Sequence, residues 1–182
     1  MTVPEPATRF AAVAVAVTVT LALTGCVQFA SSTRSLAVTE ARTMLPYAES
    51  YFEAVLADFV DRDSALAAIR AGETGFGTAL LTAETRDDVL RSDFNRTGVA
   101  LYATGADNDQ LYADVLVSAR GVTSDWTGED AEIVYLCVRQ LGTPSQPRSA
   151  SIEQATCPDD LIDITLPGTP ATVVTLAEMR SE

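Results

Sequence analysis

The chain has 182 residues and no histidine, and its 25 acidic and 12 basic residues give a net charge of −13. Without histidine it cannot form a Ser-His or Cys-His nucleophile pair, and it lacks the usual neutral metal ligand. All the basic residues are arginines, and the acidic excess argues against nucleic-acid binding, which needs a basic patch that releases counterions.

An uncharged apolar segment follows Arg9 near the start of the chain. It runs from Phe10 to Leu23, is 14 residues long and contains two threonines among alanine, valine and leucine. This length is typical of the apolar core of a signal peptide and is shorter than the roughly 20 residues of a membrane-spanning helix. The alternative is an uncleaved anchor from Phe10 to about Ala30, which would have to include the polar interruption at residues 25–28.

The apolar segment ends in Leu23-Thr24-Gly25-Cys26, which resembles the lipobox of bacterial lipoproteins. The resemblance implies that Cys26 receives a diacylglycerol and that a peptidase cleaves after Gly25. We therefore expect a signal peptide over 1–25, a lipidated tether over 26–38 and one extracytoplasmic domain over 39–182. A flexible tether of this length spans about 20 Å, so the lipid on Cys26 would hold the domain close to the cell membrane.

The other two cysteines predict a disulfide. If Cys26 is acylated, Cys137 and Cys157 remain as an even pair in an oxidising compartment. The residues between them form two extended runs around a loop, which places the bond across neighbouring antiparallel strands or close to their ends. Closing a loop of about 20 residues contributes on the order of 3 kcal/mol. A redox or metal-binding thiol pair is the alternative, but the chain has no C-x-x-C motif.

The residues after the tether predict an amphipathic helix. From Pro46 to Arg70 the apolar side chains recur at helical spacing, and Pro46 suits the first turn. We expect a break near Asp61 to Ser64, because Asp63 or Ser64 could cap a second helix. The apolar stripe is interpreted as a core face, with a partner-binding face as the alternative.

Residues 82–94 have the composition of another short helix, and beyond Gly98 the apolar period changes to that of strands. Two strands are expected within 98–121, separated by a turn at 107–109, and Ala131 to Leu141 is apolar on both faces, like a central strand. Further strands are predicted at Ser149 to Thr156 and at Ala171 to Glu178. Helices followed by strands indicate an α+β fold, with amino-terminal helices packed on an antiparallel sheet of about four to five strands. A small curved-sheet fold of the cystatin-like class is compatible with this order, although no motif selects it.

The acidic tract at 107–114, DNDQLYAD, superficially resembles a calcium loop. It lacks the glycine at loop position six and the distal bidentate glutamate, so we interpret its aspartates as turn formers. The sequence contains no nucleophile elbow, P-loop or dinucleotide fingerprint. We therefore expect no metal site and no cofactor.

Together, the leader, the cysteine pair and the missing catalytic residue types predict a membrane-anchored lipoprotein on the extracytoplasmic face of the cell membrane. Its domain is expected to bind an unidentified protein or small molecule and not to be an enzyme. Two alternatives stay open. One is a carrier that encloses an apolar ligand or lipid, and the other is a hydrolase of cell-wall polysaccharide, which would need two carboxylates about 5 to 10 Å apart in a cleft.

Overall fold

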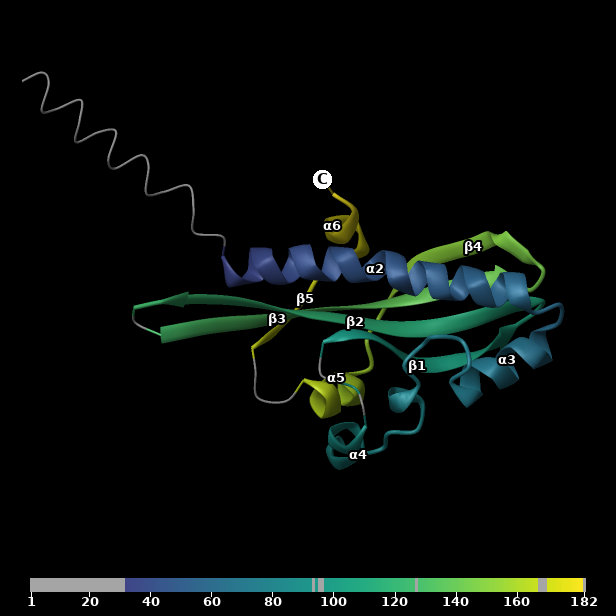
Figure 1. Cartoon of the computed structure of the whole chain (residues 1–182), viewed down its shortest axis with the longest axis horizontal. Coiled ribbons are helices and arrows are strands. Elements are labelled where there is room, and N and C mark those ends of the chain that lie inside the picture. The colour runs from purple at the N-terminus through teal and green to yellow at the C-terminus, as the bar shows by residue number, and fades with distance from the viewer. Residues whose placement is uncertain (1–31, 93, 95–96, 127, 167–169, 182) are drawn as a thin grey trace, which may run out of the picture. The chain divides into compact units, whose positions relative to one another are not determined.

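Four antiparallel strands in a meander form the centre of the fold (Figure 1). The computed structural model describes residues 32–92, 94, 97–126, 128–166 and 170–181, so the predicted signal peptide and Cys26 lie outside the described residues. The amino-terminal helices pack on the sheet, which confirms the predicted α+β class with five strands. The strands are β1 (Gly98–Asp107), β2 (Gln110–Asp125), β3 (Gly128–Thr143), β4 (Gln146–Ala155) and β5 (Ala171–Val173), the last of which pairs in parallel with β3.

Helix α2 (Thr33–Asp58) is longer than the sequence predicts. It begins directly after Ser32, whose side chain caps it, and it continues through Pro46. Residues 33–38, which the sequence assigns to a flexible tether, therefore belong to the helix. The apolar pattern did not predict residues 33–45, because two of the four buried positions there, Ala37 and Ala41, are alanines that contrast weakly with their neighbours; the other two are Val38 and Leu45.

Two glycines allow α2 to lie close to the sheet near both of its ends. A Cβ atom on Gly121 of β2 would collide with the backbone of Thr33 and Ala37. A Cβ atom on Gly142 of β3 would collide with the side chain of Leu56. The helix therefore lies over β2 at its first turn and over β3 near its last turn.

Helix α3 (Arg62–Ala71) begins at the predicted break, but Asp61 caps it rather than Asp63 or Ser64. The Asp61 carboxylate accepts a hydrogen bond from the backbone N–H of Ser64 at 2.8 Å, and this bond lowers the pKa of Asp61. The helix ends at Gly72, whose φ of 76° is the left-handed conformation that glycine favours. Its buried Ala65 and Ile69 side chains join the core under α2.

The strands divide the core into two parts, one on each face of the sheet. Under α2 and α3 the alternate residues of β2 are buried, which agrees with the strand period that the sequence shows beyond Gly98: Leu111, Ala113, Val115, Val117 and Ala119. On the opposite face, Leu116 and Cys137 pack with Val89 of α4 (Arg86–Arg91) and Leu161 of α5 (Asp159–Thr165), beside the short 3-10 helix η1 (Ala79–Leu81). β3 is therefore covered on both faces, as expected for a central strand.

Two predicted elements are wrong in extent. The strand expected over Ala171 to Glu178 ends at Val173. Helix α6 (Leu176–Arg180) follows it, and the side chain of Thr175 caps this helix. The helix expected over 82–94 is reduced to α4, which begins with a capping box formed by Thr85 and Asp88. Both helices are too short for an apolar period to reveal them, and their caps come from single polar side chains.

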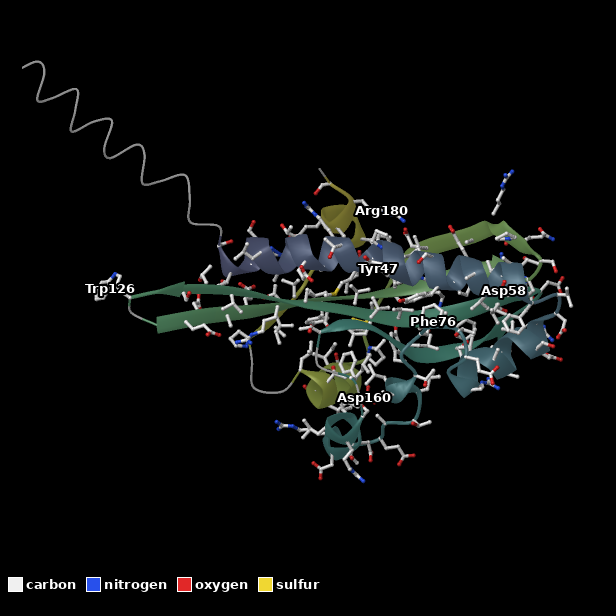
Figure 2. All side chains as sticks on the ribbon, in the orientation of Figure 1. Tyr47, Asp58, Phe76, Trp126, Asp160 and Arg180 are labelled. Atoms are coloured by element: carbon white, nitrogen blue, oxygen red, sulfur yellow. A yellow bond between two sulfur atoms is a disulfide. The ribbon has the colours of Figure 1, made fainter. Side chains whose placement is uncertain are left out.

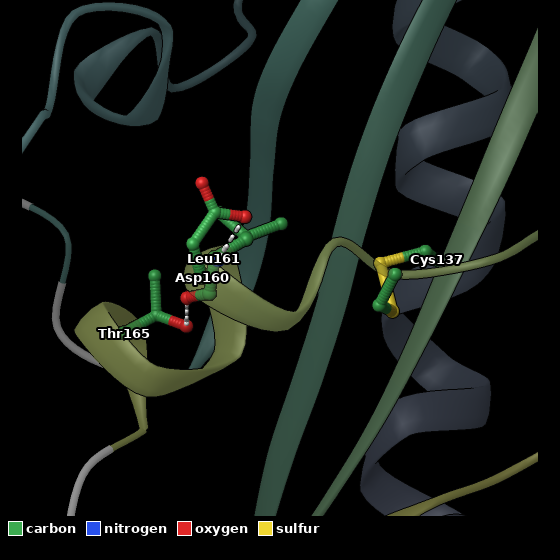
Figure 3. The surroundings of a disulfide bond; sticks show 5 residues. Cys137, Asp160, Leu161 and Thr165 are labelled. Atoms are coloured by element: carbon green, nitrogen blue, oxygen red, sulfur yellow. Dashed lines mark hydrogen bonds between the residues drawn. A yellow bond between two sulfur atoms is a disulfide. The ribbon is translucent and has the colours of Figure 1, made fainter.

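Cys137 and Cys157 form the predicted disulfide (Figure 3). Cys137 lies opposite Ala155, the last residue of β4, so the bond joins β3 to the chain just beyond β4. Helix α5 follows directly. Its Leu161 is buried against the second core, and the Thr165 hydroxyl donates a hydrogen bond to the Leu161 carbonyl at 2.6 Å. The disulfide thus fixes the start of the segment that covers this face of the sheet.

Candidate functional site

Gln140 is a polar residue buried on the apolar face of β3. Strand alternation places it on the same side as Val134, Leu136 and Val138, under α2, and it is 1% exposed. Neither atom of its side-chain amide has a hydrogen-bond partner, and both are closed to solvent. A buried polar group without a partner costs about 1 to 3 kcal/mol, so a glutamine at this position calls for an explanation.

A pocket of about 410 Å³ lies beside Gln140, between α2 and β4. The other lining residues come from three elements: Glu49, Phe52 and Glu53 from α2, residues 150–152 from β4, and Arg180 from α6. These segments are distant in the sequence, and the packing of α2 across the sheet brings them together. The pocket combines one buried amide with charged side chains and an aromatic ring.

The charges of the pocket are only partly paired. Arg180 Nη2 lies 2.7 Å from Glu49 Oε1, and this ion pair joins α6 to α2. The two side chains are 53% and 34% exposed, so the pair contributes about 0 to 1 kcal/mol. Within the described residues, no ion pair involves Glu53. The pocket therefore offers the negative charge of Glu53 near the Gln140 amide, which can both donate and accept hydrogen bonds.

The two carboxylates of the pocket lie on one wall. Glu49 and Glu53 are four residues apart on α2, and such residues are neighbours on the same face of a helix. Hydrolysis of a glycosidic bond uses carboxyl groups that flank the bond from opposite sides. The arrangement suits recognition of a ligand better than cleavage of a sugar linkage.

The acidic tract at 107–114 does not come together as a cation site. Asp107 and Asn108 lie at the turn between β1 and β2, where Asn108 has a φ of 52°. Asp114 is buried on β2 instead, and both of its oxygens accept hydrogen bonds from Arg139 at 2.7 Å. Across the described part of the chain, no group of three or more acidic, cysteine or histidine residues could hold a metal ion.

Asp114 and Arg139 form a second polar cluster, on the face of the sheet opposite α2. The Arg139 guanidinium also lies 4.8 Å from the ring centre of Tyr112, and the hydrogen bond to Asp114 raises the pKa of Arg139 further. Burial and the nearby Asp114 carboxylate raise the pKa of Tyr102 to about 12. The charges of this cluster satisfy each other, which favours a role in holding β1, β2 and β3 together.

Cys26 lies outside the described residues, and Cys137 and Cys157 are joined to each other on the face opposite the pocket. The sequence did not single out Gln140, although one signal was present: it is the polar residue in the alternating set that begins with Val134. No helix of the described residues is long and apolar enough to cross a membrane.

No protein-family model matches the chain, and neither a curated protein nor a solved structure is significantly similar to it. The functional assignment therefore depends on the residues of the chain itself.

Proposed function

We propose that this chain is a lipid-anchored binding protein on the extracytoplasmic face of the cell membrane, and that its ligand occupies the pocket between α2 and β4. The lipobox at residues 23–26 supports the anchor, and the disulfide between Cys137 and Cys157 supports an oxidising compartment. The observation that carries the binding role is the unpartnered amide of Gln140 at this pocket.

The chemistry of the pocket favours a polar ligand that carries a positive charge. The Gln140 amide pairs best with a group that both donates and accepts hydrogen bonds, such as another amide. The free carboxylate of Glu53 attracts a cation, and the net charge of −13 attracts cations to the whole surface. The ligand class is therefore an amide that carries an amine, such as a short peptide with a basic side chain.

Because the amide is closed to solvent, the ligand reaches it only when part of the pocket wall moves. The partly exposed Glu49–Arg180 ion pair in this wall costs only about 0 to 1 kcal/mol to break. A ligand cation can replace the Arg180 guanidinium beside Glu49, so opening the pocket leaves no carboxylate unpaired. Neither alternative from the sequence is favoured here, because charged walls do not suit an apolar ligand and the carboxylates share one wall.

The anchor is tested by replacing Cys26 with alanine in the native host and by treating the wild type with globomycin, which blocks the lipoprotein peptidase. We expect the variant to leave the membrane fraction and the treated wild type to keep its leader. Unchanged processing and unchanged membrane retention would remove the lipid anchor from the proposal.

The binding site is tested by titrating N-acetyl-lysine N-methylamide into the ¹⁵N-labelled protein and following the side-chain NH₂ resonances of Gln140. We expect these resonances to shift with the lysine derivative and to stay in place with the matching glutamate derivative. In the Glu53→Gln variant, the lysine derivative should no longer shift them. An equal response to both derivatives would contradict recognition of a cation, and a response elsewhere in the protein would contradict the site.

A further inference from the structure

Trp126 stands fully exposed at the tip of the β2–β3 hairpin (Figure 2). It is 95% exposed, and it is the chain's single tryptophan. The ring is a large apolar surface in contact with water. Because it packs against neither core, it does not stabilise the folded domain. Its position therefore points to a contact outside the domain.

The hairpin tip lies at the end of the domain where the leading chain joins it. Gly121 of β2 lies against Thr33 in the first turn of α2, and the hairpin continues about four residues, or about 13 Å, beyond that contact (Figure 1). Two further exposed apolar side chains, Leu36 of α2 and Val122 of β2, lie near the same contact.

Chain length limits how far this end can be from the proposed anchor. Cys26 precedes Thr33 by seven residues, which span at most roughly 25 Å when fully extended. A membrane that holds the lipid on Cys26 is thus close enough for the hairpin tip to reach it. Tryptophan is also the side chain most typical of the headgroup level of a bilayer, where its ring is apolar and its N–H is hydrated.

We propose that Trp126 inserts into the headgroup region of the membrane that carries the anchor, so that the β2–β3 hairpin forms a second contact with the bilayer. This inference rests on the proposed lipid anchor at Cys26. A second contact would restrict rotation of the domain about its short tether and would keep one orientation relative to the membrane.

Acidic residues near the tip limit the depth of insertion. Glu129 and Asp130 lie on β3, shortly after Trp126 in the sequence, and both are exposed. Glu129 forms an ion pair with Arg120 at 3.0 Å. Carboxylates do not enter the hydrocarbon, and anionic lipids repel them. The ring is therefore expected at headgroup depth, with weaker insertion as the anionic lipid content rises.

Because the chain has one tryptophan, its fluorescence reports on Trp126 alone. The chain from Cys26 onward, with Cys137 and Cys157 oxidised, has one free thiol, which can be coupled to a maleimide lipid in phosphatidylcholine vesicles. This coupling anchors the protein whether or not the cell lipidates it. We expect emission at shorter wavelength than for the uncoupled protein, and quenching by lipids brominated near the headgroup end of the chains.

The matched control moves the tryptophan to another exposed aromatic position. Tyr47 is 60% exposed on α2, about 21 Å along the helix from Thr33. The double variant Trp126→Phe, Tyr47→Trp should float with the vesicles and show neither the shift nor the quenching.

Emission of the anchored wild type that stays unshifted and unquenched while the protein floats with the vesicles would overturn the membrane contact and would favour a protein partner for Trp126. A shift with coupled protein but no lipidation of Cys26 in the cell would leave this membrane contact standing and would remove the proposed anchor. Equal shifts at both tryptophan positions would overturn the assignment to the hairpin tip.

Discussion

At residue 140, the alternation of β3 places a glutamine in line with Val134, Leu136 and Val138. A glutamine there has the apolar surroundings of a core residue but leaves two polar atoms without partners. An apolar residue would fill the space without this cost. Glutamine at this position therefore lowers the stability of the fold, which is a cost that the proposed binding role would explain.

Replacing Gln140 with methionine, which has nearly the same shape, should raise the free energy of unfolding by about 1 to 2 kcal/mol, because it removes the unpartnered amide. Urea denaturation at neutral pH measures the change. Gln110→Met at an exposed position is the matched control and should change stability by less than about 0.5 kcal/mol. A loss of stability in Gln140→Met would show that the amide has partners in the folded protein.

Tyr102 should make stability depend on alkaline pH. Its pKa is raised to about 12 in the folded protein, from an ordinary value of 10.0, because burial and Asp114 disfavour the phenolate. The contribution is complete below pH 10 and is lost as the pH rises through about 12. Tyr102→Phe should therefore lose less stability than the wild type between about pH 9 and about pH 11 in denaturation experiments. An identical loss in both proteins would contradict the assignment.

Among the secondary-structure elements, β1 to β4 and the break before α3 followed the sequence closely, whereas α2 is longer and β5 is shorter than predicted. Alternation of apolar and polar residues is a local property of a half-buried strand, so β1 and β2 were located with their turn. In its first turns helix α2 contacts the sheet at Gly121 and buries Ala37 and Ala41, so this part of the helix has little apolar contrast. Its extension through Pro46 depends on packing that the local pattern does not contain.

The close approach of α2 to the sheet predicts a large cost for a single methyl group. Gly121→Ala should destabilise the domain by about 1 to 3 kcal/mol, because the new Cβ atom meets the backbone of Thr33 and Ala37, which cannot rotate away. Gly77→Ala is the control, since its Cβ atom would lie 3.5 Å from the Val99 carbonyl oxygen, an ordinary contact. Equal melting temperatures for the two variants would contradict this close packing.

At the scale of the whole molecule, the two cores lie on opposite faces of the sheet, and the disulfide belongs to only one of them. The larger core lies between α2 and the sheet, while the bond between Cys137 and Cys157 holds the smaller core on the opposite face. This division separates the pocket at Gln140 from the disulfide, because neighbouring residues of β3 point to opposite faces.

Reduction of the disulfide should lower the free energy of unfolding by on the order of 3 kcal/mol, because the unfolded chain regains the freedom of a loop of about 20 residues. Urea denaturation with and without dithiothreitol measures this loss. Dithiothreitol should have no effect on the double variant Cys137→Ala, Cys157→Ala. An equal effect on that variant would assign the loss to the reductant rather than to the bond.

The sequence by itself predicted the α+β class and most of the strands from local periodicity, and it predicted the pairing of Cys137 with Cys157 once the lipobox resemblance had assigned Cys26 to the lipid. It also predicts the leader and the lipid on Cys26, which lie outside the described residues. Only the tertiary structure decided the pocket, since Glu49, Gln140 and Arg180 are far apart in the chain and meet where α2 crosses the sheet. It likewise decided that Trp126 projects beyond the first turn of α2, because a strand pattern does not fix where a hairpin lies relative to a helix.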